Sequence, residues 1–163
     1  MRGVSLLDYE SKGNYNMNDY IVIRATEPWQ RAGAYSVRVQ GMNREHNISL
    51  QEEFDENDGN KSKYIVLLDK TYPIATCRFY KLDEHSVLLG RVVVLPDYRD
   101  NHLGSKIIRE AEKWIAELGY KEIFIDSRVD VVGFYEKLGY ALLDGTVVKS
   151  WKFDCKRMCK SIK

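Results

Sequence analysis

The sequence predicts a single α+β (α/β) domain with a mixed, mostly antiparallel central sheet that is flanked by helices on both faces. Three apolar, strand-like runs follow one another with only short polar turns between them, and segments with helical signals separate the earlier and later runs. Strands that are joined directly pair antiparallel, whereas strands separated by a helix can pair in parallel. The sheet should therefore be mixed.

Length and composition limit the class of protein. The chain has 163 residues, of which 44% are hydrophobic, enough for one core of ordinary size. We expect one domain over residues 19–155, a polar arm at 1–18 and a basic tail at 156–163. Lys and Arg (25) nearly balance Asp and Glu (24), so no field of one sign attracts nucleic acid or an anionic membrane.

The apolar runs indicate the compartment of the protein, and the cysteines indicate whether its thiols are reduced. No apolar run approaches the ~20 residues of a membrane-spanning helix. The three cysteines cannot all pair within the chain, and their spacing does not suggest a zinc site. We therefore expect a cytoplasmic protein with reduced thiols and no metal.

The N-terminal half begins with an expected strand at Tyr20–Ile23 and a helix over 28–40. Thr26-Glu27-Pro28 supplies an N-cap and a proline in the first turn of that helix. Gly41–Asn47 interrupts the helical pattern, and Gln51–Asn60 reads as an acidic, turn-rich linker on the surface. The inward face of the helix would include Trp29, Ala32, Tyr35 and Val37.

An antiparallel meander comes next. Its strands are Tyr64–Leu68, Ile74–Phe79 and Val87–Leu95, which polar turns separate. Gly90 lies inside the third strand and is a candidate for a β-bulge.

The C-terminal half begins with the strongest helical signal. From Leu103 to Leu118 the apolar residues recur three or four positions apart, and Gly119 ends the helix. The elements expected after it are a strand at Ile123–Ile125, a short helix at Val131–Leu138, and a hairpin of Tyr140–Leu143 with Val147–Phe153 across Asp144-Gly145.

The junction between the meander and the long helix is the main candidate site. The strand ends Val92-Val93-Val94, and the loop into the helix reads Arg99-Asp100-Asn101-His102-Leu103-Gly104-Ser105. The first amides of a helix have no partners within it, so the amides of this loop can converge on a phosphate, and Arg99 can add a charge-assisted contact. An ordinary strand-to-helix turn, whose glycine allows close packing, is the alternative.

A second motif, Gly133-Phe134-Tyr135-Glu136-Lys137-Leu138-Gly139-Tyr140, lies in the next strand–helix unit. With Val94-x-Pro96-x-Tyr98-Arg99-x-x-x-x-Gly104 it resembles the GNAT superfamily of acetyl-CoA-dependent N-acetyltransferases, over roughly residues 20–153. The resemblance implies a GNAT-like sheet and acetyl-CoA as co-substrate. It also implies that the cofactor-binding residues are Val92, Val93, Val94, Arg99, Asp100, Asn101, His102, Leu103, Gly104, Ser105 and Tyr135.

Two positions depart from the family pattern. Asp100 and His102 stand where the family usually has glycine. Glycine lets a backbone approach a pyrophosphate without a Cβ, so these residues imply a looser grip or side chains that point outward.

Tyr135 is the candidate catalytic residue. The resemblance places it where the family has its general-acid tyrosine. A phenol, with a reference pKa ≈ 10, stays protonated at neutral pH and can donate to a departing thiolate. The alternative is an aromatic side chain that only packs over the sheet.

No general base is evident, because Val87–Arg91 carries no carboxylate. Cys77 is predicted to be a small core residue, so we favour direct transfer over an acyl-enzyme. The titratable candidates for the base, each with a polar surface role as the alternative, are Glu53, Asp55, His46 and His85.

The expected function is transfer of the acetyl group of acetyl-CoA to a primary amine of a small molecule or peptide, in a ternary complex. A non-catalytic acyl-CoA-binding module with the same fold is the alternative, which Asp100 and His102 favour. We expect no nucleic acid or membrane partner, and a homodimer stays open. The amine cannot be identified, because its pocket would come from residues 28–60, where the carboxylates either attract a cationic amine or form a solvated face.

Overall fold

The computed structural model describes residues 20–150 and 152–163, so the arm expected at 1–18 lies outside the described residues. Within these residues the sheet has seven strands in the order β1-β2-β3-β4-β5-β7-β6. Only β4 and β5 pair in parallel, which confirms a mixed, mostly antiparallel sheet. The strands are β1 (Tyr20–Ala25), β2 (Ser62–Asp69), β3 (Tyr72–Lys81), β4 (Ser86–Val94), β5 (Glu122–Arg128), β6 (Ala141–Ser150) and β7 (Phe153–Ser161).

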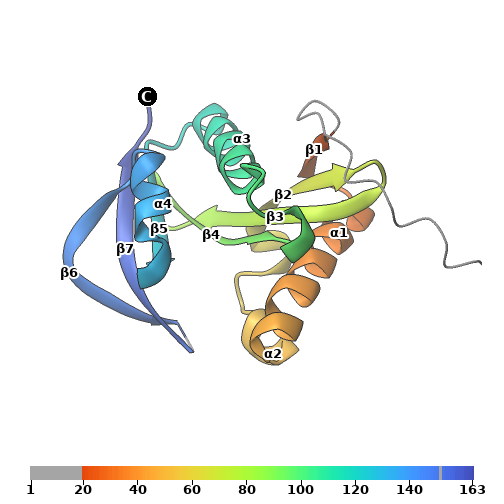
Figure 1. Cartoon of the computed structure of the whole chain (residues 1–163). Coiled ribbons are helices and arrows are strands. Elements are labelled where there is room, and N and C mark those ends of the chain that lie inside the picture. The colour runs from red at the N-terminus through yellow and green to blue at the C-terminus, as the bar shows by residue number, and fades with distance from the viewer. Residues whose placement is uncertain (1–19, 151) are drawn as a thin grey trace, which may run out of the picture.

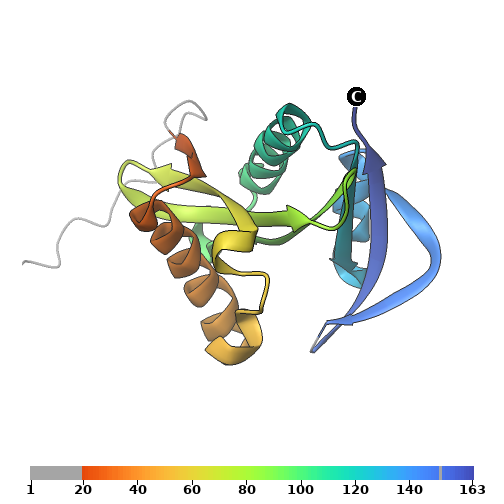
Figure 2. The ribbon, with the colours of Figure 1, turned by 180° about the vertical axis from the view of Figure 1, so that it is seen from behind.

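Helices cover both faces of the sheet, as predicted. Figure 1 shows α3 on one face of β2–β4 and α1 with α2 on the other, and Figure 2 shows the same layers from behind. No helix in the described part of the chain is long and apolar enough to cross a membrane. The helices are α1 (Pro28–Arg38), α2 (Leu50–Glu53), α3 (Leu103–Glu117) and α4 (Val132–Lys137), and a π-helical turn at Val39–Arg44 continues α1 where a break was expected.

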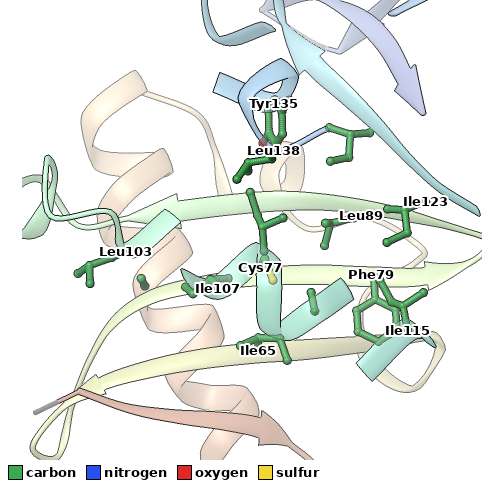
Figure 3. Packing of buried hydrophobic residues seen from close by; sticks show 14 of the residues in the cluster. Ile65, Cys77, Phe79, Leu89, Leu103, Ile107, Ile115, Ile123, Tyr135 and Leu138 are labelled. Atoms are coloured by element: carbon green, nitrogen blue, oxygen red, sulfur yellow. The ribbon is translucent and has the colours of Figure 1, made fainter. Parts of the chain in front are cut away.

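The main core lies between the sheet and the helices α3 and α4. Cys77 and Leu89 from the sheet pack with Ile107 of α3 and Leu138 of α4 (Figure 3). Cys77 is fully buried, which confirms its predicted place in the core. A smaller cluster around Tyr64 fills the opposite face. Because both faces are covered, β2 and β3 are continuous apolar runs rather than alternating ones.

The inward face of α1 was predicted only in part. Val37 is buried and Tyr35 packs against the smaller cluster, as expected. Trp29 is 61% exposed and Ala32 is exposed, so their assignment to the inward face is wrong. Trp29 lies five residues before the buried Ala34, about 140° around the helix. Its apolar surface suggested burial, but the helical period places it outside.

Gly41 makes the closest approach of the helical layer to the sheet. A Cβ built on it would overlap Cγ1 of Val93, whereas a Cβ on Gly33 would make ordinary contacts of 3.5 Å with Pro73 and Val66. We expect Gly41→Ala to lower the free energy of unfolding by about 1–3 kcal/mol, because a packed core resists an added methyl group.

The matched control is Gly33→Ala in the same helical segment. It should be neutral, or stabilise by up to about 1 kcal/mol through helix propensity. Urea denaturation of both variants measures the difference. If Gly41→Ala were as stable as Gly33→Ala, the side chain of Val93 would have moved aside without an energetic cost.

The C-terminal hairpin differs from the prediction. Asp144-Gly145 lies within β6, where the pairing with β7 shifts register between Leu142 and Val147, and Ser150 pairs with Phe153 at the actual turn. The assignment of 156–163 to a basic tail is wrong, because residues up to Ser161 form β7 between β5 and β6.

Charge pairing explains how so basic a segment lies inside the sheet. Arg157 binds Asp126 at 2.7 Å, and Lys160 binds Glu112 at 2.9 Å. Both carboxylates are distant in sequence from this segment. The composition of the segment alone therefore indicated a solvated C-terminus. Trp151, expected in the last strand, lies outside the described residues.

The feature that positions the site is the separation of β4 from β5. The two strands pair only where Ser86–Leu88 faces Glu122–Phe124. Figure 1 shows β5, β6 and β7 set apart from β1–β4.

The edge of β4 that pairs with β3 contains a bulge, because Arg91 and Val92 together oppose one residue of β3. Arg91 has φ +50°, so the bulge lies one residue beyond the predicted Gly90. A bulge increases the local twist and ends regular pairing.

Candidate active site

The loop before α3 has the backbone that the sequence implied. Asp100 (φ +63°) and His102 (φ +57°) both lie in the left-handed region. Glycine adopts this region most easily, which explains its place in the family pattern, and Asp and His tolerate it better than most residues. The exposed His102 is the N-cap of α3 and makes no side-chain capping hydrogen bond. In the described part of the chain the first-turn amides at 103–105 therefore lack a capping side chain, which leaves them able to bind an anion.

Arg99 and Asn101 hold this loop in place. The guanidinium of Arg99 binds Glu45 through two contacts of 2.8 and 2.6 Å, and its Nε donates to the carbonyl oxygen of Val94 at 3.0 Å. The Arg99 hydrogen bond lowers the pKa of Glu45. The amide of Asn101 donates to the carbonyl oxygens of Tyr98 and Arg99. A phosphate contact from Arg99 stays a prediction.

The structure brings the two sequence motifs together at Gly104. A Cβ on Gly104 would lie 3.4 Å from Cζ of Phe134, so the start of α3 approaches α4 closely at this point. Leu103 is buried in the core and holds the first turn of α3 against the sheet. The phosphate-loop motif and the motif that contains Tyr135 thus border one region.

Tyr135 lies on α4 and is 8% exposed. Its ring contacts Phe134 and Tyr140 edge to face, at 5.1 and 6.0 Å. Burial raises the pKa of its phenol, and the nearby thiols of Cys77 and Cys155 add to that shift. Within the described residues its hydroxyl has no hydrogen-bond partner. Cys77 belongs to β3 and Cys155 to β7, so the hydroxyl lies between the two halves of the sheet, still protonated at neutral pH.

The strand β4 supplies the backbone beside this hydroxyl. Val93 packs with Val37 and Leu95 beneath the sheet, whereas Val92 and Val94 pack against the main core. Beyond Leu88 the edge of β4 that faces β5 has no strand partner in the described chain. Apart from the Val94 carbonyl, which Arg99 binds, the N–H and C=O groups on this edge are available to an extended, amide-containing ligand.

The acidic stretch that begins in α2 is not the solvated linker that was expected. Glu53 is 3% exposed, and the side chain of Asp58 is nearly buried as well. Arg38 of α1 is 0% exposed and binds Glu53 at 2.8 Å and Asp58 at 2.6 Å. Arg78 of β3 binds Asp55 at 2.7 Å and Asp58 at 2.9 Å. Multiple charge-assisted contacts offset the cost of burying these charges.

This buried ion cluster comprises Arg38, Arg78, Arg91, Glu53, Asp55 and Asp58. This cluster was not predicted from the sequence. The run of acidic residues is visible in the sequence, but the arginines that pair with it come from three other elements, α1, β3 and β4. One signal was present: Arg38 lies four residues after Ala34, on the inward face of α1. Four of the six residues in the cluster belong to the segment 28–60, from which the amine pocket was expected.

One of the proposed bases, Asp55, is paired with arginine, as is its neighbour Asp58. Burial opposes the shift, but hydrogen bonds from Arg38 and Tyr64 hold the pKa of Asp58 far below its usual range, and Arg78 lowers that of Asp55 in the same way. A carboxylate with a lowered pKa is a weak base at neutral pH. His46 faces the ring of Phe153 at 5.4 Å. The other candidates are Glu53, bound by Arg38, and His85, in the turn before β4.

Acid should destabilise the protein through this cluster. A carboxyl with a lowered folded pKa stabilises the native state above its unfolded pKa, about 3.9, and this contribution is lost as the pH falls through the folded value. We expect the free energy of unfolding to fall progressively below about pH 5. Asp58→Asn should be less stable at pH 7 and less sensitive to acid, as measured by urea denaturation across pH. An unchanged slope would contradict a native-state role for the Asp58 charge.

Residues 24–140 match the model of the Acetyltransferase (GNAT) family. The chain belongs to this family. The uncharacterised N-acetyltransferase YjcF of Bacillus subtilis is 32% identical over 114 residues, which cover 70% of this chain and 80% of YjcF. An uncharacterised acetyltransferase of Streptococcus pyogenes is 27% identical over 113 residues, covering 69% and 77% of the two chains.

Solved structures show the same GNAT fold. A Lactobacillus plantarum protein provisionally named an N-acetyltransferase superposes with a TM-score of 0.81 at 29% identity, covering 88% of this chain and 99% of that one. A GNAT acetyltransferase from Elizabethkingia anophelis, with acetyl-CoA bound, superposes with a TM-score of 0.66 at 11% identity, covering 89% and 99%. The chain is thus a GNAT acetyltransferase, a family whose co-substrate is acetyl-CoA.

Proposed function

We propose that this GNAT acetyltransferase transfers the acetyl group of acetyl-CoA to a primary amine of a small molecule or peptide, by direct attack in a ternary complex. The observation that carries the proposal is the position of Tyr135. Its protonated hydroxyl lies between the separated strands, and its helix α4 closely approaches the start of α3, whose first amides suit a pyrophosphate.

The reaction assigns a task to each part of the site. The neutral amine attacks the thioester carbonyl, and a backbone amide of Val92–Val94 donates a hydrogen bond to the oxyanion that forms. When the tetrahedral intermediate collapses, the C–N bond stays, the C–S bond breaks, and Tyr135 gives its proton to the departing thiolate. The proton that the amine loses goes to solvent, and solvent returns a proton to Tyr135.

Binding of acetyl-CoA is proposed to use two backbone surfaces. The amides of Asn101, His102, Leu103, Gly104 and Ser105 surround the pyrophosphate at the start of α3, while the open edge of β4 pairs with the pantetheine amides. Arg99 acts by holding the loop through Glu45, and Asp100 provides the left-handed turn.

The experiment that tests the proposal combines the full chain with acetyl-CoA and a panel of amines and peptides. Release of free CoA thiol and an acetylated product detected by mass support it. A non-catalytic acyl-CoA-binding module is the second candidate, because Glu53, Asp55 and Asp58 are all paired with arginines. Thermal stabilisation by acetyl-CoA without any product would favour that module, and no stabilisation at millimolar acetyl-CoA would contradict both.

His102 gives a further check on the loop. Its side chain is exposed and its backbone has the conformation that glycine prefers. We expect His102→Gly to bind acetyl-CoA at least as tightly as the parent protein, because a Cβ is removed and no capping bond is lost. Isothermal titration calorimetry measures the Kd. Binding weaker by threefold or more would mean that the imidazole itself contacts the ligand.

A further inference from the structure

Arg91 is the unusual member of the buried ion cluster. It lies in the bulge of β4 with φ +50°, a conformation that costs energy because the Cβ comes close to a backbone carbonyl oxygen. Its side chain is 22% exposed, whereas those of Arg38 and Arg78 are almost completely buried. Strained backbone that a fold retains is concentrated at functional sites.

The guanidinium of Arg91 is poorly compensated. Its contacts are long: Nε and Nη2 lie 3.3 and 3.2 Å from the carbonyl oxygen of Glu53, Nε lies 3.4 Å from the Glu53 carboxylate, and Nη2 lies 3.3 Å from Asp55. Among the described residues nothing binds its Nη1. By contrast, Arg38 and Arg78 have ion pairs of 2.6–2.9 Å.

The charges around Arg91 also show that its own charge is weakly compensated. Burial, together with the like charges of Arg78 and Arg38, lowers the pKa of Arg91, although Glu53 opposes the shift. Arg38 and Arg78 behave oppositely: their ion pairs raise the pKa of each guanidinium despite burial. An added anion would therefore be stabilised more by Arg91 than by Arg38 or Arg78, whose charges are already paired.

Arg91 also lies close to the proposed reaction centre. It is the third residue after Leu88, where the pairing of β4 with β5 ends, and it opposes Cys77 across the bulge. Cys155 lies near both groups, because its thiol adds to the raised pKa of Tyr135 and the Arg91 charge acts to lower the pKa of that thiol, which burial raises. Arg91 contacts Glu53 at the end of α2, whereas Tyr135 comes from α4 in the main core, so the two approach from opposite faces of the sheet.

We propose that Arg91 binds a carboxylate of the acceptor, so that the amine substrate is an amino acid or a peptide with a carboxylate near its amine. This inference rests on the proposed function. A guanidinium binds a carboxylate through two parallel hydrogen bonds, and the free Nη1 of Arg91 is available for one of them. Binding there would orient the amine toward the thioester.

Product-side ligands test this without requiring turnover. N-acetyl amino acids with small, aromatic, acidic and basic side chains are titrated against the full chain in the presence of CoA, each beside its uncharged C-terminal amide. We expect the best-bound carboxylate to bind at least about tenfold tighter than its amide, as hydrogen bonds to a charged group allow. Equal binding of acid and amide across the set, or no binding of either, would overturn the inference.

Variants separate Arg91 from general electrostatics. Arg91→Met should abolish the preference for the acid, and Arg91→Lys should retain part of it. Arg128→Met, which removes an arginine of the neighbouring strand that is paired with Asp130, should retain all of it. Thermal stabilisation by acetyl-CoA shows that each variant is folded. A preference that survives Arg91→Met would contradict the role of Arg91.

The two proposals fail in different ways. Acetylation of amines that lack a carboxylate, at rates equal to those of amino acids, would support acetyl transfer and contradict the role of Arg91. Tight binding of N-acetyl amino acids that depends on Arg91, with no acetylated product from any amino acid or peptide, would support carboxylate recognition and contradict catalysis.

Discussion

Tyr135→Phe is expected to reduce kcat by tens-fold or more while the Kd for acetyl-CoA stays nearly unchanged. The substitution removes only the hydroxyl, so the ring keeps its contacts with Phe134 and Tyr140. Without the phenol the thiolate departs unprotonated, and general acids contribute factors of ~10²–10⁴ to such steps. The measurement is steady-state kinetics with the amine that the panel identifies, together with calorimetric titration of acetyl-CoA.

Tyr140→Phe is the matched control. Its hydroxyl donates a hydrogen bond of 3.0 Å to the buried Glu112, so its loss should lower stability by about 1–3 kcal/mol rather than turnover. Equal kcat values for Tyr135→Phe and the parent protein would remove Tyr135 from the chemistry. Equal losses of kcat in the two variants would point to packing around α4 instead of proton transfer.

Arg38→Met is expected to be the most destabilising of the single substitutions considered. Arg38 is 0% exposed and provides hydrogen bonds to the Glu53 carboxylate and carbonyl and to both carboxylate oxygens of Asp58. Removing it leaves two carboxylates out of water without their main partner, which costs about 3–5 kcal/mol in buried ion pairs. Urea denaturation at pH 7 measures the change in the free energy of unfolding.

Lys81→Met is the control for loss of a positive charge at the surface. Lys81 and Glu84 form an exposed pair in the turn between β3 and β4. Such pairs contribute about 0–1 kcal/mol, so the variant should unfold nearly with the parent protein. If Arg38→Met cost no more than Lys81→Met, the cluster would not stabilise the fold. Restored stability in Arg38→Met at low pH, where the carboxyls are neutral, would further identify the unpaired charges as the cause.

Local pattern was sufficient for most of the fold. The period of α3, the polar turns of the meander and the glycines after α3 and α4 depend on neighbours within a few residues, so the sequence shows them directly. The same holds for the two site motifs, whose loop and helix are each continuous in sequence. Their contact through Gly104 and Phe134 requires the tertiary structure.

Errors arose where the burial of a charged or apolar residue depends on a distant partner. Residues 156–161 were assigned to a tail because their charges had no visible partners, and Asp126 and Glu112 neutralise two of them. The turn at Asp144-Gly145 was expected because those residue types favour turns, yet pairing with β7 carries the strand through it.

The sequence by itself determined that the chain folds as a mixed sheet between helical layers, and that a phosphate-type loop is followed by a short helix with Tyr135. These features follow from periodicity and local backbone preference. Only the tertiary structure decided that the acidic stretch beginning in α2 is buried against arginines, that β4 separates from β5 beyond Leu88, and that the bulge holds Arg91, whose Nη1 has no partner among the described residues. The physical reason is that electrostatic pairing and strand register join residues from different elements, and a linear pattern does not contain those distances.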